Sequence, residues 1–291
     1  MRALAAISSS VIAFALLLAF GTGTAQAGRG GSPQLIKSAI SANSVDAIQA
    51  ELERSEYLVC AACIDLVVPL VDHSDSRVRT VAAWGRARRG ASRQVYLSML
   101  QRLGQPDSLA ARNAADILGE LGYPSSIPAL SAALSNPIFT ADARAAMARA
   151  LGSIGRTDAA PALVGVLASP DPAVKASALS ALRQIQGFQQ AAAAAPLLGD
   201  SDQQVRAEAA LTLGTALRTG KVGVQPAGVE QLLAVLATEP SADVRKKAAW
   251  SLGEMGAPVS QAAPGLEAAA SADSSPAVRS LARIAISKLS R

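Results

Sequence analysis

Two cysteines, Cys60 and Cys63, form the one closely spaced pair of residues suited to redox chemistry, and the chain contains no other cysteine. Thiols three residues apart approach closely enough to bond in the first turn of a helix, where the backbone geometry can relax. In an oxidising compartment such a pair is expected to be oxidised. We therefore predict a local Cys60–Cys63 disulfide, with two buried reduced thiols or a redox-active pair as the alternatives.

The sequence offers little for metal binding or acid–base catalysis, because it contains a single histidine, His73. A zinc site built from Cys60, Cys63 and His73 would lack an obvious fourth ligand. Covalent haem attachment would need a histidine directly after Cys63, and Ile64 stands there. No strand-flanked Gly-x-Ser-x-Gly segment supplies a nucleophile either. We expect no metal, no cofactor and no catalytic residue.

The composition indicates the kind of fold that carries these residues. The 291 residues are 50% hydrophobic, 17% charged and only 3% aromatic. The apolar fraction is too high for a disordered chain. Abundant alanine favours helices, and scarce aromatic residues disfavour sheets. The sequence therefore predicts an all-α protein.

The first 27 residues have the pattern of a secretory signal peptide. Arg2 precedes an apolar stretch at 11–20, and Ala25-Gln26-Ala27 suits the cleavage site. The stretch is about half of the ~20 residues that cross a bilayer, so we expect no stable membrane insertion after cleavage. We predict an exported protein, periplasmic or extracellular, with a flexible linker at 28–32. Its net charge of +5 is modest and interspersed, and we expect no nucleic-acid partner.

A repeated unit organises the rest of the chain. Seven copies begin with a valine or alanine, followed in six of them by a basic residue and then by small residues that in four copies end in Leu-Gly, and they recur about every 32 residues. Between them lie segments with leucines four apart, typical of a second helix. Two short helices bury their apolar faces only by stacking on their neighbours. We predict a right-handed α-solenoid of about seven helix pairs over 57–291, preceded by capping helices at 33–56.

The pattern D-x-x-V-R-x-x-A-A-x-x-L-G resembles HEAT-like repeats, specifically the short type named after phycobilisome lyases, over roughly residues 57–290. Two copies depart from it: Ala111, not Arg112, falls in the arginine column, and Arg183 stands where glycine belongs. HEAT-like iron hydroxylases bind iron through repeated His-Glu pairs, which this sequence lacks. The resemblance therefore does not imply that activity.

A basic column recurs in these units, and we interpret it as structural. HEAT-like repeats use such arginines and aspartates to bridge successive turns, and Asp75, Asp171 and Asp202 lie four residues ahead of a column member. The members are Arg79, Arg144, Lys175, Arg206, Arg245 and Arg279. A denser cluster lies at Arg86, Arg88, Arg89 and Arg93. It is typical of a solvated helix end, with Arg88 and Arg89 as candidates for attracting an acidic partner.

The column six residues after the valine holds the candidate binding residues. In the inner helix of each unit, we expect the second and sixth positions after the valine to point away from the core. Both tryptophans fall in the sixth column, which reads Trp84, Asp116, Arg149, Ser180, Leu211, Trp250 and Ile284. Each tryptophan either covers a groove between repeats or anchors a partner. Under the second interpretation Trp84 and Trp250 are aromatic anchors, with Asp116 and Arg149 between them.

Two functions are compatible with the sequence. The first is a non-catalytic exported scaffold, or adaptor, that binds another exported protein along the concave face of the solenoid. The alternative is an enzyme or accessory factor of the chromophore-lyase type, acting with a partner chain. Nothing in the sequence gathers polar groups as an active site does, so we favour the scaffold.

Overall fold

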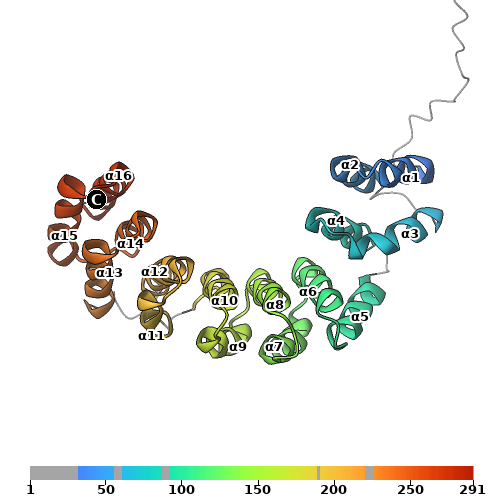
Figure 1. Cartoon of the computed structure of the whole chain (residues 1–291), viewed down its shortest axis with the longest axis horizontal. Coiled ribbons are helices and arrows are strands. Elements are labelled where there is room, and N and C mark those ends of the chain that lie inside the picture. The colour runs from blue at the N-terminus through green and yellow to red at the C-terminus, as the bar shows by residue number, and fades with distance from the viewer. Residues whose placement is uncertain (1–31, 56–60, 87–91, 189–190, 220–225, 291) are drawn as a thin grey trace, which may run out of the picture.

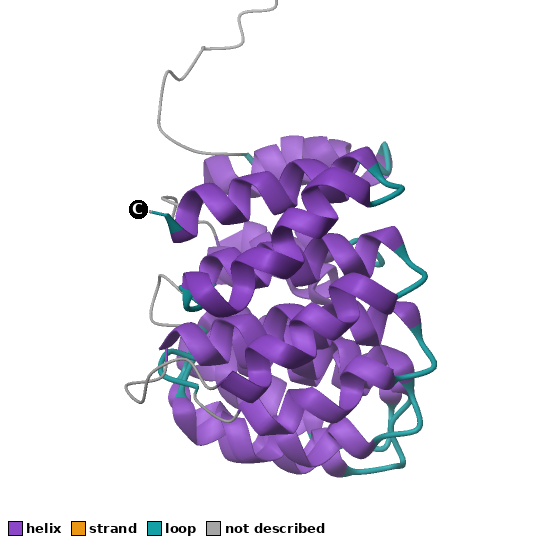
Figure 2. Ribbon diagram, turned by 90° about the vertical axis from the view of Figure 1, so that its left-hand side faces the viewer, coloured by secondary structure: helices purple, strands orange, loops and turns teal. Residues whose placement is uncertain are grey.

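The protein forms an arc of stacked helix pairs in the computed structural model, which describes residues 32–55, 61–86, 92–188, 191–219 and 226–290. Figure 1 shows one row of helices on the concave side of the arc and a second row on its convex side. Every regular element in these ranges is a helix, as Figure 2 shows. The predicted all-α solenoid is confirmed. The predicted signal peptide and Cys60, Arg88 and Arg89 lie outside the described residues.

Each unit contributes one inner helix to the concave side and one outer helix to the convex side. The inner helices are α2 (Val45–Ser55), α4 (Ser76–Arg86), α6 (Ser108–Leu121), α8 (Ala141–Ile154), α10 (Pro172–Gln184), α12 (Gln203–Thr219), α14 (Ala242–Glu254) and α16 (Pro276–Leu289). The outer helices are α1 (Pro33–Ser41), α3 (Ala61–Val67), α5 (Ser92–Leu103), α7 (Ile127–Ser135), α9 (Ala160–Gly165), α11 (Ala191–Ala194), α13 (Pro226–Thr238) and α15 (Val259–Ala272). In the residues that the structure describes, seven pairs therefore follow the α1–α2 pair, as the repeat count predicts.

The helix ends follow from local sequence. Side chains of Asp107 and Thr140 accept hydrogen bonds from the first backbone amides of α6 and α8, which satisfies donors that have no partner within the helix. Both helices end at a glycine with positive φ, Gly122 at 66° and Gly155 at 68°. Ser32, at the end of the predicted linker, caps α1 in the same way through its hydroxyl.

Several outer helices are preceded or followed by a short 3₁₀-helix. Such turns lie at Val68–Asp72 after α3, Pro124–Ser126 before α7, Val166–Ala168 after α9 and Ala195–Gly199 after α11. Proline occupies the first or second position of three of these turns, where its missing N–H leaves no bond unmade. The convex side is therefore built from shorter and less regular helices than the concave side.

The core runs along the whole arc between the two rows of helices. The leucine column of the inner helices is fully or almost fully buried, at Leu118, Leu151, Leu182, Leu213 and Leu252. Outer-helix leucines such as Leu130 and Leu163 meet it and are also completely buried. Because each unit shares its apolar surface with the next, the core is continuous and no single pair encloses one.

Glycine allows neighbouring inner helices to approach closely. A methyl group added at Gly119 would lie 2.8 Å from the Cα of Ala150, and one at Gly152 would lie 2.7 Å from the Cα of Ala181. Both distances are shorter than any normal contact, so the glycine column sets the spacing of α6, α8 and α10. At Arg183, the predicted exception, the longer side chain instead pairs with Glu208 on α12.

Candidate interaction surface

Backbone hydrogen bonds at the start of each inner helix fix the register of the columns. The amide of the basic-column residue donates to the carbonyl four residues earlier, as in Arg206 to Asp202 and Arg245 to Ser241. In the second unit the amide that does so is that of Ala111, which donates to Asp107. The prediction that Ala111 holds the place of the arginine is therefore confirmed.

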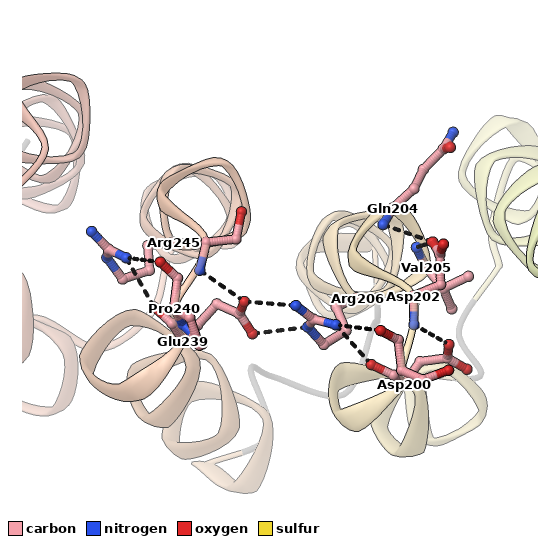
Figure 3. Close-up of polar contacts among 10 residues, drawn as sticks. Asp200, Asp202, Gln204, Val205, Arg206, Glu239, Pro240 and Arg245 are labelled. Carbon is pink, nitrogen blue, oxygen red and sulfur yellow. Dashed lines mark hydrogen bonds and ion pairs between the residues drawn. The ribbon is translucent and has the colours of Figure 1, made fainter.

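A ladder of ion pairs joins successive units through the basic column (Figure 3). Nη1 of Arg206 donates to the carbonyls of Asp200 and Ser201 at 2.9 and 3.0 Å in the turn of its own unit. Its Nε and Nη2 each donate at 2.9 Å to the carboxylate of Glu239 in the next unit. This two-point contact fixes the geometry of both groups as well as attracting them.

Arg245 repeats the arrangement one unit further on. Its Nη1 donates to the carbonyls of Glu239 and Pro240, both at 2.9 Å, and its Nε and Nη2 each donate at 2.8 Å to Asp273. The side chains of Arg245 and Asp273 are 10% and 6% exposed. Hydrogen bonding to Arg245 lowers the pKa of Asp273 below its ordinary value, and Arg206 does the same to the pKa of Glu239. These buried pairs clamp adjacent turns together.

Of the three acids predicted for this ladder, Asp171 bridges successive units, whereas among the described residues Asp75 and Asp202 contact only their own helix. Asp202 does not pair with the arginine four residues later; its carboxylate caps α12 by accepting from the amides of Gln204 and Val205. Asp171 pairs with Arg144 of the preceding unit, at 3.6 Å. Five members of the column each reach forward to an acid of the next unit: Arg79 to Asp116, Arg144 to Asp171, Lys175 to Asp200, Arg206 to Glu239 and Arg245 to Asp273.

Sequence reasoning missed the acids that carry the last three rungs. Asp200, Glu239 and Asp273 each lie five residues before the valine of their unit. They bind Lys175, Arg206 and Arg245 of the preceding unit. An acidic column at this position is visible in the sequence and, read across units, could have identified them.

The sixth column is accessible to solvent in every unit whose side chain is described. Trp250 is 39% exposed and Ile284 is 49% exposed, while Ser180 and Leu211 are half-buried. The side chain of Trp84, on α4, is outside the described part. The inner helices line the concave side (Figure 1), and their buried columns meet neighbouring helices, so we infer that the exposed sixth column faces the concave surface.

Asp116 and Arg149 of this column contact each other but differ in exposure. Arg149 Nη2 lies 3.8 Å from Asp116 Oδ1, and the two side chains are 49% and 18% exposed. Asp116 also accepts a 2.6 Å bond from the completely buried Arg79. Its carboxylate is therefore occupied by the interior of the protein, and Arg149 is the more available of the two.

The expectation for the second position after the valine holds only in part, because three alanines there are buried, whereas the side chains are half-buried or exposed at Thr80, Arg112, Lys246 and Ser280. Ala145, Ala176 and Ala207 hold this position in three consecutive units and are at most 5% exposed. This side of each inner helix faces the next inner helix, where only a small side chain fits. The single-helix pattern could not show this, because it treats every face away from the outer helix as exposed.

Comparisons with known proteins agree with this geometry. The sequence signature of HEAT repeats matches residues 96–183, 139–199 and 191–287, which together span more than half of the chain. The chain belongs to the HEAT-repeat family. A search of the curated proteins finds no matching sequence.

Solved structures with HEAT-like architecture resemble the chain at low sequence identity. The Escherichia coli protein YibA is 17% identical to this chain, with a TM-score of 0.56. The match covers 89% of this chain and 91% of YibA. An engineered protein is 22% identical, with a TM-score of 0.52 and coverage of 90% and 82%. The complex of CpcE and CpcF of phycocyanin lyase from Nostoc sp. gives 22% identity, a TM-score of 0.44 and coverage of 78% and 94%. At these identities the likeness concerns the fold alone.

Two of the grooves in the described part of the chain lie between outer helices. One, of about 300 Å³, lies between α13 and α15 and is lined largely by Leu233, Leu236 and alanines. The other, of about 290 Å³, lies between α5 and α7 beside Leu103 and Phe139. Within the described ranges, no group of three or more potential metal ligands occurs, and no helix has the length and apolarity to span a bilayer.

Two further sites predicted from the sequence fall partly outside the described residues. Cys63 is 5% exposed in α3 and does not carry a free thiol, but Cys60 is not described, so the Cys60–Cys63 bond stays a prediction. His73 lies in the turn before α4 as expected, where its Nδ1 accepts a 3.1 Å bond from the amide of Asp75. Of the predicted basic cluster, only the exposed Arg93 has a described side chain.

Proposed function

We propose that this HEAT-repeat protein is a non-catalytic, exported scaffold that binds another exported protein along its concave face. The contact residues are those of the sixth column, with Trp250 and Trp84 as anchors and Arg149 as the polar contact between them. Arg88 and Arg89 add attraction for an acidic partner. Extended concave surfaces of repeat arrays serve this purpose generally.

The observation that carries this proposal is the exposure of large apolar side chains on consecutive inner helices. Trp250 on α14 is flanked in its column by Leu211 on α12 and Ile284 on α16. Trp250 and Ile284, which are 39% and 49% exposed, contribute little to the core, and Leu211 is half-buried. Apolar side chains that line up across repeats offer a partner a continuous hydrophobic strip.

Tryptophan makes the strongest contribution expected from such a strip. It buries a large area on binding while losing little rotamer freedom, and a true anchor contributes at least about 2 kcal/mol. We therefore expect Trp250→Ala and Trp84→Ala each to weaken partner binding at least about tenfold, with the melting temperature within a few degrees of wild type. Leu97→Ala is the matched control, because Leu97 is 51% exposed on the outer helix α5.

The test begins with a photo-crosslinking residue at position 250 or, as control, at position 97. Crosslinked proteins from the native envelope are identified by mass spectrometry, and the purified partner is titrated against each variant. Equal affinities for wild type and Trp250→Ala would refute the proposed surface. Turnover or a bound chromophore in the purified protein would refute the scaffold role itself.

Export is tested separately. The mature protein recovered from the cell envelope or medium should begin at Gly28, since the Ala25-Gln26-Ala27 sequence precedes the expected cleavage point. Amino-terminal sequencing measures this directly. A chain that retains Met1 and stays with the cytoplasmic fraction would contradict this part of the proposal.

A further inference from the structure

The last rung of the arginine ladder is incomplete. Nη1 of Arg279 donates to the carbonyls of Asp273 and Ser274 at 2.7 and 3.3 Å, as Arg206 and Arg245 do in their own units. In those units Nε and Nη2 bind a carboxylate from the following unit. Nε and Nη2 of Arg279 make no hydrogen bond within the described part of the chain. The half of the guanidinium that binds carboxylate elsewhere is therefore held in place and open.

The face of α16 that carries Arg279 differs from the same face of the other inner helices. Between units this face is made of small residues, such as Ala249 and Gly253 on α14, which allow the next helix to approach closely. On α16 the corresponding positions hold Arg283 and Ser287, and both are exposed. A polar outer face is typical of the terminal repeat of an array. This face is therefore not suited to another inner helix at the same spacing.

The charge of α16 indicates what this face attracts. The helix carries Arg279, Arg283 and Lys288 and no acidic residue. Arg283 is exposed one turn after Arg279 and uses one of its donors on the carbonyl of Ala270 at 3.1 Å. Lys288 pairs with Glu254 on α14. Arg279 and Arg283, one turn apart, thus make no hydrogen bond or ion pair to a carboxylate among the described residues.

A second copy of this chain does not supply the missing group. In a head-to-tail stack, the turn between α1 and α2 of one copy would occupy the place of the next unit. Aligning the start of α2 with the other inner helices puts Ala42 where Glu239 and Asp273 stand. The turn from Ala42 to Ser44 contains no carboxylate. In that arrangement a second copy supplies no carboxylate to Arg279.

We propose that the outward face of α16 is a binding site for an acidic segment of a partner protein, with Arg279 receiving a carboxylate through Nε and Nη2 and Arg283 a second one. The occupied rungs of the ladder are the precedent for the ligand class, because the same arginine geometry binds Glu239 and Asp273. Two-point contact of guanidinium with carboxylate is also the strongest form of this interaction. The site lies on a different side of α16 from Ile284 of the sixth column and does not depend on the function proposed above.

The experiment uses a blocked hexaglutamate peptide as the probe and follows the Nε–Hε resonances of the arginines of the full mature chain by NMR. We expect saturable shifts at Arg279 and Arg283 and none with hexaglutamine. Arg279→Gln should raise the Kd for hexaglutamate at least about tenfold. Arg156→Gln is the matched control, because Arg156 is 57% exposed at another turn, and it should leave the Kd unchanged.

Further measurements separate specific binding at Arg279 from misfolding and from nonspecific attraction. Arg279→Gln should leave the melting temperature within a few degrees of wild type, since no carboxylate among the described residues pairs with this side chain. An equal loss of affinity in Arg156→Gln would overturn the proposal as nonspecific attraction. So would the same Arg279 shift with inorganic phosphate at equal concentration, or self-association that depends on Arg279. Trp250→Ala should bind hexaglutamate like wild type, so failure here and failure of the concave surface are distinguishable.

Discussion

Replacing Gly152 by alanine tests the idea that glycine sets the spacing of the inner helices. The new methyl group would lie 2.7 Å from the Cα and 2.8 Å from the Cβ of Ala181 on α10. The nearest atom belongs to the backbone, so no side-chain rotation relieves the contact. The helices α8 and α10 must move apart, which loosens the packing of both units against each other.

The size of the effect follows from two opposing terms. Overpacking a tight contact costs about 1–3 kcal/mol, and a backbone contact this short belongs in the upper part of that range. Alanine is a better helix former than glycine by about 1 kcal/mol, which offsets part of the loss. We expect Gly152→Ala to lower the free energy of unfolding by about 1–2 kcal/mol.

Gly165→Ala is the matched control for this measurement. Gly165 lies in the outer helix α9, and a methyl group there would have no neighbour within 4 Å. Only the helix-propensity term remains, so the control should be neutral or more stable by up to about 1 kcal/mol. Urea unfolding followed by circular dichroism, with equal slopes for all three proteins, gives the comparison. A Gly152→Ala protein as stable as wild type would refute the close-approach argument.

Further predictions concern the ladder and the thiols. Asp273→Asn should lower the free energy of unfolding by about 1–3 kcal/mol, because it removes a charged, largely buried partner; Asp158→Asn, 63% exposed, should have no measurable effect in the same urea assay. Arginine partners lower the pKa values of Asp273 and Glu239. These pairs should therefore contribute fully to stability above the ordinary carboxyl pKa range, and their contribution should be lost as the pH falls through the lowered pKa values. The urea concentration at the unfolding midpoint should accordingly decrease when the pH is brought below about 4. Non-reducing mass spectrometry after alkylation should find Cys60 and Cys63 unmodified; two alkylated thiols in protein from the envelope would contradict the predicted bond.

The sequence predicts the helix pairs well because their signals are local. The buried leucine column and the basic column repeat at a nearly constant interval, and each start of an inner helix is marked by a capping residue. Even the irregular unit containing Ala111 is assigned correctly, because its glycine, Gly119, fixes the register. The same arithmetic identifies the sixth column, whose exposure at Trp250 and Ile284 agrees with the expected orientation.

The contacts between units could not be predicted from local sequence. Arg206 binds Glu239, 33 residues later, and not Asp202, four residues earlier, because the carboxylate of Asp202 is already bound to the amides of its own helix. The burial of Ala176 at the second position likewise depends on how close the next inner helix lies.

The sequence by itself therefore determined the number of units, their helical nature and the register of every column, because each depends on residues within one unit. Only the tertiary structure decided which carboxylate each arginine binds, which small residues meet, and that Arg279 ends the ladder with half of its donors open. These outcomes depend on the distance and rotation between successive units. Both result from packing across the whole interface, so the residues of a single repeat do not determine them.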